Sequence, residues 1–396
     1  MSGLLPVEEA QARLLALRSP ISSEKVSFSE CVGRYTSDNI FAQRDQPAAP
    51  VSAMDGYAIR FDELPGPWTV VGESAAGTAP GRTVNPGEAM RIFTGAIVPS
   101  GADTVIVQED VAVDGAALTL TRDGPGTRGR HIRARASDFA ASECLLPAGT
   151  RLTPGAIAAA AMSGADQLAV GRRPRVAILT TGDELVQAGR ALTASQIPDS
   201  NSPMISAMLA SEPAEVSLPH HVRDDRPLLA KVLKDLARRH DVIVTVGGAS
   251  VGDHDHVRGA LQDAGGQIDF WKIAMRPGKP LIAGRIADAV LLGLPGNPSS
   301  AFVTATLFLL PLVRHLAGAR NPHPAIHQAP LATALDGGGA RRDYLHARLE
   351  NGRLTPLHSQ DSGMTLPLAA ANALLIREID APRRAAGDVA DYIVTA

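Results

Sequence analysis

The chain has 396 residues, more than one ordinary domain of about 100–200 residues holds, so we expect several domains. Hydrophobic residues make up 45% of it, which is enough to form packed cores and excludes a wholly disordered chain. The 38 Lys and Arg residues nearly balance the 41 Asp and Glu residues, for a formal charge of −3. Because these charges form no basic arm or patch, we expect no nucleic-acid partner.

The sequence also bears on redox chemistry and on membranes. Two cysteines, Cys31 and Cys144, are too few for a disulfide framework or a closed zinc site. We therefore expect both to be small side chains that pack in the core. The first residues lack the basic segment, apolar core and cleavage site of a secretory signal. The longest apolar run, 301–313, contains Pro311 and is shorter than the roughly 18 residues of a membrane span. We therefore predict a soluble, cytoplasmic protein with no membrane partner.

The first 150 residues favour a helix followed by a β-rich segment. Residues 7–18 carry apolar side chains at helical spacing, and 26–28 look like a strand. From about residue 40 to 150, short β-branched runs alternate with Gly, Pro and Asp turns, at 68–71, 104–107 and 117–120. This texture predicts a mostly antiparallel β domain.

Beyond Arg173 the pattern changes to alternating strands and helices. Short apolar runs fall at 176–179, 216–218, 242–246 and 290–294. Helical patterns separate them, the clearest at 227–239. This alternation predicts a doubly wound parallel sheet covered on both faces. A proline-bearing linker after Gly318 leads to a final segment of short strands that predicts a small β-barrel.

The segments that follow the predicted strands carry the candidate site residues. In an open parallel sheet, ligands bind outside the carboxyl ends of the strands. There the chain places glycines that would form an anion nest and carboxylates that would hold a magnesium ion beside phosphate. These residues are Glu184, Asp224, Asp225, the 247–252 loop, Asp255 and the 295–299 loop.

Each of these features also has an ordinary explanation. A Gly-Gly pair after a strand is commonly a turn, Asp224 or Asp225 could cap the next helix, and Asn297 before a proline is a good helix cap. The Asp-His-Asp-His run at 253–256 is better explained by solvent exposure than by a transition metal. We favour a ligand site because all the features fall at one predicted sheet edge.

A cationic turn lies between the third and the last predicted strands. Arg276 and Lys279 flank a Pro-Gly pair, so they could line an oxyanion pocket or lie on a surface hairpin, and the sequence supports both about equally. The chain has no Gly-Lys-Ser/Thr phosphate loop, which argues against a P-loop NTPase.

The order of these motifs resembles that of a known family. The matching segments are 52–58 (SAMDGYA), 91–96 (RIFTGA), 181–185 (TGDEL), 247–252 (GGASVG) with Asp255, 276–280 (RPGKP) and 293–298 (GLPGNP). Together they closely resemble the molybdopterin molybdenumtransferases, the MoeA family that includes the E domain of gephyrin. Six motifs in the same order make a chance resemblance very improbable.

The resemblance implies a multidomain α/β plus β fold. It implies a small helix/strand domain I at 1–43 and 139–171, and an inserted β-rich domain II at 44–138. The α/β molybdopterin-binding-like domain III would be 172–319, with a central doubly wound parallel sheet. A C-terminal β-barrel-like domain IV would be 320–396. The resemblance also implies a homodimer in which the β-rich domain reaches the partner's site.

The implied activity is insertion of molybdate into molybdopterin adenylate, which yields molybdenum cofactor and AMP with magnesium as cofactor. By resemblance, the catalytic residues would be Glu184, Asp255, Asp55 and Lys279. Magnesium would be held by Glu184, Asp224, Asp225 and Asp255. Molybdate would be bound by Arg276, Lys279, Pro280, Arg341 and Ser362. The adenylate would contact Thr94, Gly247, Gly248, Ser250, Gly252, Pro295, Gly296, Asn297 and Ser299. Asp138 matches a further acidic position, and a molybdopterin adenylyltransferase is a candidate partner.

Several positions depart from the family pattern. Arg276 stands where lysine is usual, His346 where arginine is common, and Asp361 where a glycine precedes Ser362. Ala136-Ser137 replaces a Gly-Glu pair before Asp138. These departures leave a second interpretation open, a gephyrin-like scaffold with reduced or lost catalysis. A molybdopterin adenylyltransferase is a weaker alternative, because its loop resembles Gly-Gly-Thr-Gly and this chain has additional β-rich segments.

Overall fold

The computed structural model describes residues 4–247 and 256–395. By their contacts, the residues form two compact units. The larger unit comprises Met1–Asp38, Ala148–Thr153 and Gln167–Ala396, and the smaller unit comprises Asn39–Pro147 and Pro154–Asp166. The four-domain division expected above stays a prediction, since contact clustering divides the chain on a coarser scale.

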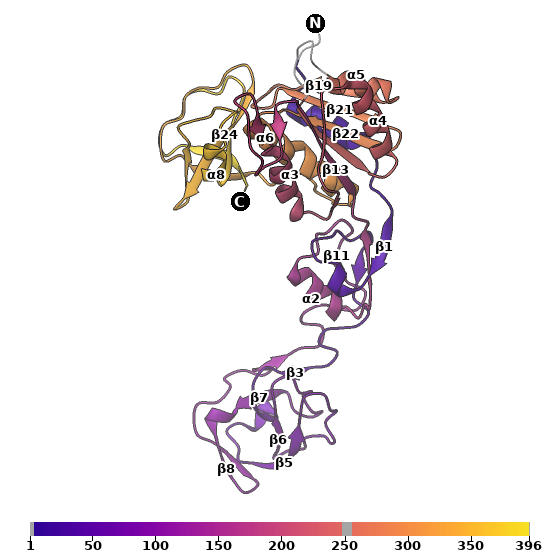
Figure 1. The fold of residues 1–396 in the computed structure, drawn as a ribbon. Coiled ribbons are helices and arrows are strands. Elements are labelled where there is room, and N and C mark those ends of the chain that lie inside the picture. The colour runs from indigo at the N-terminus through magenta and orange to yellow at the C-terminus, as the bar shows by residue number, and fades with distance from the viewer. Residues whose placement is uncertain (1–3, 248–255, 396) are drawn as a thin grey trace. The chain divides into compact units, whose positions relative to one another are not determined.

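A seven-stranded sheet forms the centre of the larger unit (Figure 1). Its order is β16 (Glu215–Val216), β13 (Arg175–Thr181), β18 (Val242–Val246), β22 (Ala289–Leu294), β21 (Pro280–Ile286) and β19 (Gln267–Lys272), with β17 (His220–Val222) also paired to β13. The predicted strands β16, β13, β18 and β22 pair with one another in parallel, as expected, and β17 is also parallel to β13. The sheet is nevertheless mixed, because β21 and β19 extend it in antiparallel fashion.

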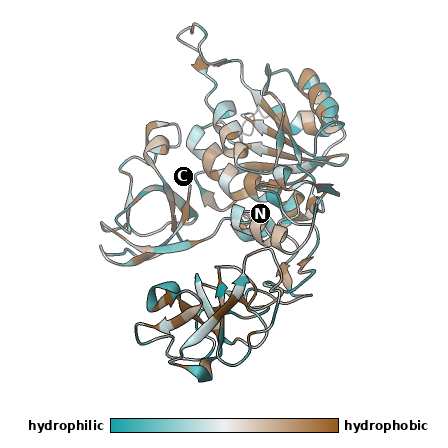
Figure 2. Ribbon diagram, turned by 90° about the horizontal axis from the view of Figure 1, so that it is seen from below, coloured by the Kyte–Doolittle hydropathy of each residue, from teal (hydrophilic) through white to brown (hydrophobic). Residues whose placement is uncertain are grey.

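Helices cover both faces of this sheet because its strands are apolar on both sides. On β18, Val242, Val244 and Val246 join one core cluster and Ile243 joins the other. The first face packs against α1 (Val7–Ala16), α3 (Asn201–Ala210), α6 (Pro298–Thr304), the π-helical turn η4 (Ala305–Leu309) and α7 (Leu310–Leu316). The second packs against α4 (Arg226–Ala237) and α5 (His256–Asp263). Figure 2 shows hydrophobic strands between helices whose outer faces are hydrophilic.

The apolar run 301–313 lies within a longer helix. Residues Pro298–Leu316 are helical throughout, 19 residues, although the sequence contains Pro311. The π-helical turn η4 ends two residues before that proline, and such a turn accommodates a residue without a backbone N–H. By length and composition this helix could cross a membrane, but 78% of its apolar window is buried inside the protein, as in a core helix.

A second, barrel-like sheet forms the C-terminal part of the larger unit. Its order is β20 (Met275–Arg276), β24 (Arg342–Glu350), β26 (Ala373–Arg377), β27 (Val389–Val394) and β23 (His327–Pro330), with β25 (Arg353–Pro356) also paired to β24. A bridge between Leu331 and Leu354 brings β23 and β25 together, which curls the sheet toward closure. Strand β20 comes from the segment before the linker, so the cationic turn is joined directly to this sheet.

The remaining elements of the larger unit are short. They are β1 (Ser23–Val26) paired with β12 (Leu168–Gly171), β14 (Leu185–Val186) paired with β15 (Ile197–Pro198), η1 (Phe28–Glu30) and α8 (Leu366–Ala370).

The smaller unit is β-rich, as the sequence predicts. Its main sheet has the order β7 (Thr104–Val107), β4 (Gly56–Ile59), β6 (Glu88–Ile92), β5 (Trp68–Ser74), β9 (Ala117–Leu120) and β8 (Val111–Asp114). All neighbours are antiparallel except β5 and β6. The unit also contains η2 (Phe61–Glu63), η3 (Gln108–Asp110), β3 (Val51–Ser52) with β10 (Ile132–Arg133), β2 (Ile40–Phe41) with β11 (Cys144–Leu146), and α2 (Pro154–Met162).

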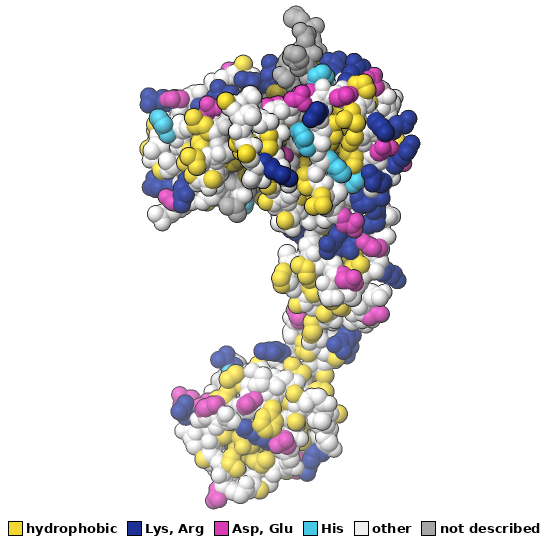
Figure 3. Space-filling model, in the orientation of Figure 1, with side chains coloured by type: hydrophobic (Ala, Val, Ile, Leu, Met, Phe, Trp, Pro, Cys, Tyr) yellow, Lys and Arg dark blue, Asp and Glu magenta, His cyan; other side chains and the backbone are white. Residues whose placement is uncertain are grey.

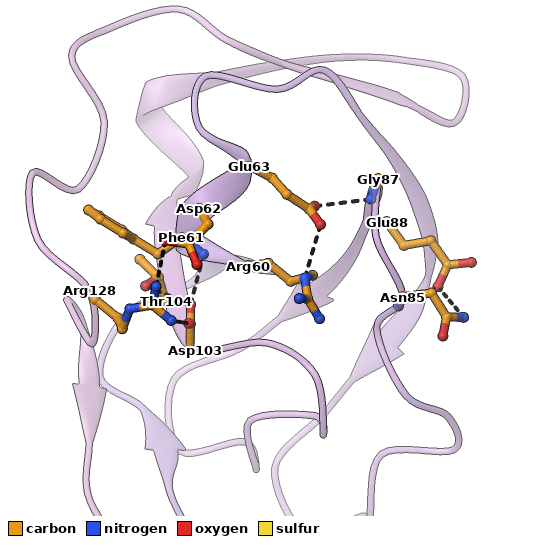
Figure 4. A network of polar contacts seen from close by, with 10 residues as sticks. All are labelled: Arg60, Phe61, Asp62, Glu63, Asn85, Gly87, Glu88, Asp103, Thr104 and Arg128. Carbon is orange, nitrogen blue, oxygen red and sulfur yellow. Dashed lines mark hydrogen bonds and ion pairs between the residues drawn. The ribbon is translucent and has the colours of Figure 1, made fainter.

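Polar contacts tie the loops of the smaller unit together (Figure 4). Arg128 pairs with both Asp62 and Asp103, and Asp103 accepts the backbone N–H of Phe61 at 2.8 Å. Glu63 accepts the N–H of Gly87 at 3.0 Å. These contacts join segments far apart in sequence. On the face drawn in Figure 3, Lys and Arg side chains are interspersed with Asp and Glu side chains.

Candidate functional site

A cavity of about 620 Å³ lies at the carboxyl ends of β13, β18 and β22. Its lining brings together twelve of the predicted site residues: Glu184, Asp224, Gly247, Arg276, Lys279, Pro280, Pro295, Gly296, Asn297, Ser299, Arg341 and Ser362. They come from seven stretches of the chain, so tertiary structure assembles the site. Both the central sheet and the C-terminal sheet contribute to the wall.

The loop after β13 carries the acidic end of the cavity. Gly182 has φ +140°, and a Cβ there would lie 2.7 Å from Oε2 of Glu184, so glycine lets the backbone pass beside this carboxylate. Thr181 is among the lining residues, and its buried hydroxyl has no hydrogen-bond partner among the described residues. A buried polar atom without a partner is costly, which indicates that a ligand or water contacts it.

Two glycines let the next loops approach each other. Gly247 has φ +88°, and a Cβ there would lie 2.6 Å from the carbonyl oxygen of Thr181. A Cβ on Gly296 would lie 3.6 Å from the Cα of Gly247. The backbone is therefore closely packed at Thr181, Gly247 and Gly296, which lie at or just beyond the ends of β13, β18 and β22.

The 295–299 loop is fixed by residues far away in sequence. Asn297 precedes Pro298 at the start of α6, but its side chain does not cap the helix; it donates to the hydroxyl of Ser362 at 2.9 Å. The backbone N–H of Ser299 donates to the carbonyl of Ser362 at 3.1 Å. These bonds place Ser362, from the segment after β25, in the cavity wall. The helix-cap explanation considered for Asn297 is thus wrong for its side chain.

A further contact to this loop was not predicted. Asn201, in the first turn of α3, donates from its side-chain nitrogen to the carbonyl oxygen of Gly296 at 2.7 Å. Asp199 accepts the N–H groups of Asn201 and Ser202, both at 3.0 Å, and so fixes the start of that helix. The Asp-Ser-Asn-Ser sequence at 199–202 signals a helix start, but it does not indicate which loop Asn201 contacts.

Three cations also line the cavity. Arg276 and Lys279 come from the turn that links β20 and β21, and Arg341 directly precedes β24. Gly278, between the first two, has φ +100°, and a Cβ there would lie 2.5 Å from a side-chain carbon of Thr304, so the turn requires glycine. Within the described chain, Lys279 and Arg341 have no ion-pair partner, whereas Arg276 pairs with Asp343 at 2.7 Å. The surface-hairpin alternative does not describe this turn, because it faces a cavity.

The adjacent carboxylates Asp224 and Asp225 have different roles. Asp224 lines the cavity. Asp225 is the N-cap of α4, and its carboxylate accepts the backbone N–H of Leu228 at 2.9 Å. The structure thus places Asp224 in the lining of the same cavity as Glu184 and assigns Asp225 to the helix.

Two of the departures from the family pattern have a structural account. His346 is buried in the cavity wall, its Nε2 lies 2.6 Å from the hydroxyl of Ser299, and burial lowers its pKa. The carboxylate of Asp361 accepts the N–H of Gly363 at 2.9 Å, which closes its own turn. Burial also raises the pKa of Tyr344, another lining residue, to about 12.

The predicted residues of the smaller unit form a pair of their own. Asp55 accepts the backbone N–H of Thr94 at 2.7 Å and its hydroxyl at 2.8 Å. These two hydrogen bonds hold the pKa of the Asp55 carboxyl below its usual value. Elsewhere in this unit, Asp138 lines a hollow with Arg44 and Arg133.

Four predicted site residues, Gly248, Ser250, Gly252 and Asp255, lie outside the described residues. Within residues 4–247 and 256–395, no group of three or more His, Cys, Asp or Glu side chains is placed to hold a metal ion. The predicted magnesium ligands that the structure does describe in the cavity are Glu184 and Asp224.

Models of known families match three consecutive parts of the chain. Residues 5–164 match the MoeA N-terminal region (domains I and II). Residues 177–315 match a probable molybdopterin binding domain, and 328–395 match the MoeA C-terminal region (domain IV).

Individual proteins match over nearly the whole chain. A molybdopterin molybdenumtransferase of Nostoc sp. is 36% identical over 378 residues, 91% of this chain and 86% of that protein. One from Staphylococcus aureus is 29% identical over 402 residues, 99% of this chain and 96% of that protein. The crystal structure of the molybdopterin biosynthesis moeA protein from Pyrococcus horikoshii OT3 is 26% identical, with a TM-score of 0.83 over 99% of this chain and 100% of that one. The chain, with its cavity at the carboxyl ends of the central strands, therefore belongs to the MoeA family.

Proposed function

We propose that this protein is a molybdenum insertase that takes molybdopterin adenylate and molybdate and yields molybdenum cofactor and AMP. The observation that carries the proposal is the convergence of predicted residues, both carboxylates and cations, on the lining of one cavity. The 36% identity to a protein named molybdopterin molybdenumtransferase supports the same reaction. No observation favours the scaffold interpretation.

The cationic side of the cavity suits molybdate. Molybdate is a tetrahedral dianion, so fixed cations on more than one side of it are needed to bind it tightly. Arg276, Lys279 and Arg341 supply such cations, and the hydroxyl of Ser362 lies in the same wall. In this proposal Lys279 contributes a point charge and the two arginines contribute planar forks.

The glycine-bearing side suits the adenylate. The close approach of the loops at Gly247 and Gly296 leaves backbone groups available to phosphate oxygens. Asn201 and Ser362 hold the 295–299 loop in place, so that a substrate finds it already ordered. Fixed hydrogen-bond donors at the reacting phosphate lower the barrier without reorganisation during the reaction.

The acidic end of the cavity fits a magnesium ion by its chemistry. Glu184 and Asp224 offer the hard oxygen ligands that Mg²⁺ prefers. When bound, the ion would act as a Lewis acid on the phosphoanhydride. Glu184 and Asp224 would hold it, and Asp255 would join them as the resemblance implies.

The proposal extends to assembly and location. We propose a cytoplasmic homodimer in which Asp55 and Thr94 of the smaller unit serve the partner's site. The hydrogen bonds between these two side chains order a polar pair that a substrate could contact.

The test of the function is AMP release. Purified protein is given molybdopterin adenylate and magnesium, with and without molybdate, and AMP and active cofactor are measured. We expect AMP and cofactor to form together and to depend on molybdate. Binding of the adenylate without any release of AMP would contradict the insertase and favour the scaffold interpretation.

A further inference from the structure

A buried carboxylate lies behind the cationic wall of the cavity. Asp343, near the start of β24, is opposite Arg276 of β20 in the parallel register and opposite Arg377 of β26 in the antiparallel register. Its side chain is 3% exposed, with Oδ1 2.7 Å from Nε of Arg276 and Oδ2 2.7 Å from Nη2 of Arg377. Directly opposed residues on neighbouring strands have adjacent side chains, so the sheet itself creates this row of alternating charge.

The two arginines of this row differ in their surroundings. Arg377 is 12% exposed and is also held from its far side, where Nη1 donates to the carbonyl oxygen of Asp336 at 2.9 Å. Arg276 is 54% exposed and lines the cavity. Arg377 therefore fixes Asp343, and Asp343 in turn holds the arginine that faces the ligand.

Asp343 contacts Nε of Arg276, which leaves the two terminal nitrogens of the guanidinium for a ligand. A guanidinium has five N–H donors, one on Nε and four on the two terminal nitrogens. The ion pair uses Nε, and the terminal nitrogens have no hydrogen-bond or ion-pair partner among the described residues. The row of two arginines and one aspartate keeps a net charge of +1, so the cavity retains a cation whose orientation is fixed.

We propose that Asp343 is a positioning residue for the oxyanion, acting through Arg276. It holds Nε so that the terminal nitrogens are oriented for a tetrahedral oxyanion before that ligand arrives. Ordering a long side chain in advance removes part of the entropy cost of binding. The identity of the oxyanion as molybdate rests on the proposed function.

The proposal also accounts for arginine at position 276. A lysine has one ammonium nitrogen, which would have to contact Asp343 and the oxyanion at once. A neutralising contact to the buried carboxylate would then compete with the ligand. In this chain Arg276 contacts Asp343 through Nε and leaves its terminal nitrogens to contact the oxyanion.

The test is a double-mutant cycle on molybdate affinity, measured by calorimetric titration of purified protein with sodium molybdate. Because a lost charge-assisted hydrogen bond is worth a few kcal/mol at most, we expect Asp343→Asn to weaken molybdate binding roughly tenfold. In an Arg276→Ala background, Asp343→Asn should cause no further loss. The matched control is Glu378→Gln, which breaks the 2.8 Å pair with Arg342 in the same sheet, outside the cavity lining, and should leave affinity unchanged.

Two results would overturn the inference. The first is additivity, in which Asp343→Asn weakens binding equally with and without Arg276. The second comes from Arg276→Lys, which keeps the charge at a half-exposed position and so tests the inference even if Asp343→Asn fails to fold. We expect this variant to lose molybdate affinity, and wild-type affinity would contradict the proposed division between nitrogens.

The outcome is separable from that of the proposed function. If molybdate binds with the expected coupling but the wild type releases no AMP, the insertase proposal fails and the role of Asp343 stands. If AMP release depends on molybdate but the cycle is additive, the inference about Asp343 fails alone. If the wild type binds no molybdate, both fail.

Discussion

At the scale of single residues, neighbouring side chains of the same charge have different roles. Asp224 faces the cavity, while Asp225 caps α4 by accepting the N–H of Leu228. Lys279 lines the cavity without an ion-pair partner in the described chain, while Arg276 is held by Asp343. Residue type alone therefore does not assign a role; the direction of the side chain decides it.

The carboxylate pair provides a matched test of the metal assignment. Asp224→Asn should lower AMP release and raise the magnesium concentration needed for half-maximal rate, because an amide is a weaker ligand than a carboxylate. Asp225→Asn should leave both nearly unchanged, because asparagine caps helices about as well as aspartate. AMP release measured across a magnesium titration checks both. The opposite ranking would move the metal ligand to Asp225.

The buried imidazole of His346 should make stability depend on pH. Burial lowers its pKa in the folded protein below the ordinary value of 6.5, so the unfolded chain binds a proton more readily. Its contribution is therefore complete above about pH 6.5 and is lost as the pH falls toward the folded pKa. The free energy of unfolding, measured between about pH 5 and pH 7.5, should fall more steeply on acidification in the wild type than in His346→Gln. Equal slopes would show that His346 does not titrate as described.

At the scale of elements, the turns after the strands decide the shape of the site. Gly247 and Gly296 allow the loops after β18 and β22 to touch, and Gly278 allows the cationic turn to pack on Thr304. The strands supply a rigid base, and the glycines bring the backbone of the loops close to the ligand.

Comparing Gly→Ala variants at two glycines distinguishes the effect of backbone strain from that of a steric clash. Gly247 and Gly265 have φ +88° and +83°, but only at Gly247 would a Cβ meet a backbone atom, 2.6 Å away; at Gly265 nothing lies within 4 Å. Both Gly→Ala variants should lose about 1–2 kcal/mol of stability from the left-handed backbone. Gly247→Ala should in addition lose most of its AMP release, because its loop must move away from Thr181. Thermal unfolding and the AMP assay measure the two effects, and full activity in Gly247→Ala would contradict this account.

At the scale of the whole molecule, two consecutive strands join the central sheet to the C-terminal sheet. Strand β20 lies before the linker in sequence but pairs with β24 of the C-terminal sheet, while β21, which follows it closely, belongs to the central sheet. The turn between these strands carries Arg276 and Lys279. The cationic wall is therefore built where the two sheets of the larger unit meet.

The proposed dimer predicts complementation between defective subunits. If Asp55 serves the partner's site, a purified heterodimer of one Asp55→Asn subunit and one Lys279→Ala subunit has one intact site and one doubly defective site. We expect about half the AMP release of the wild type, whereas each homodimer should be nearly inactive. Differently tagged, coexpressed subunits allow the heterodimer to be isolated. An inactive heterodimer, or a monomer in sedimentation analysis, would contradict the proposal.

The sequence by itself determined four strands of the central sheet, the β-rich nature of the smaller unit and the polar residues that follow the predicted strands. These properties follow from local periodicity and from the rule that ligands bind at the carboxyl ends of parallel strands. Tertiary structure alone decided that the sheet is mixed, that Asp224 rather than Asp225 lines the cavity, and that Asn201 and Asp343 support it. The reason is physical: those contacts join residues far apart in the chain or depend on which way a side chain points, and neither property leaves a local pattern in the sequence.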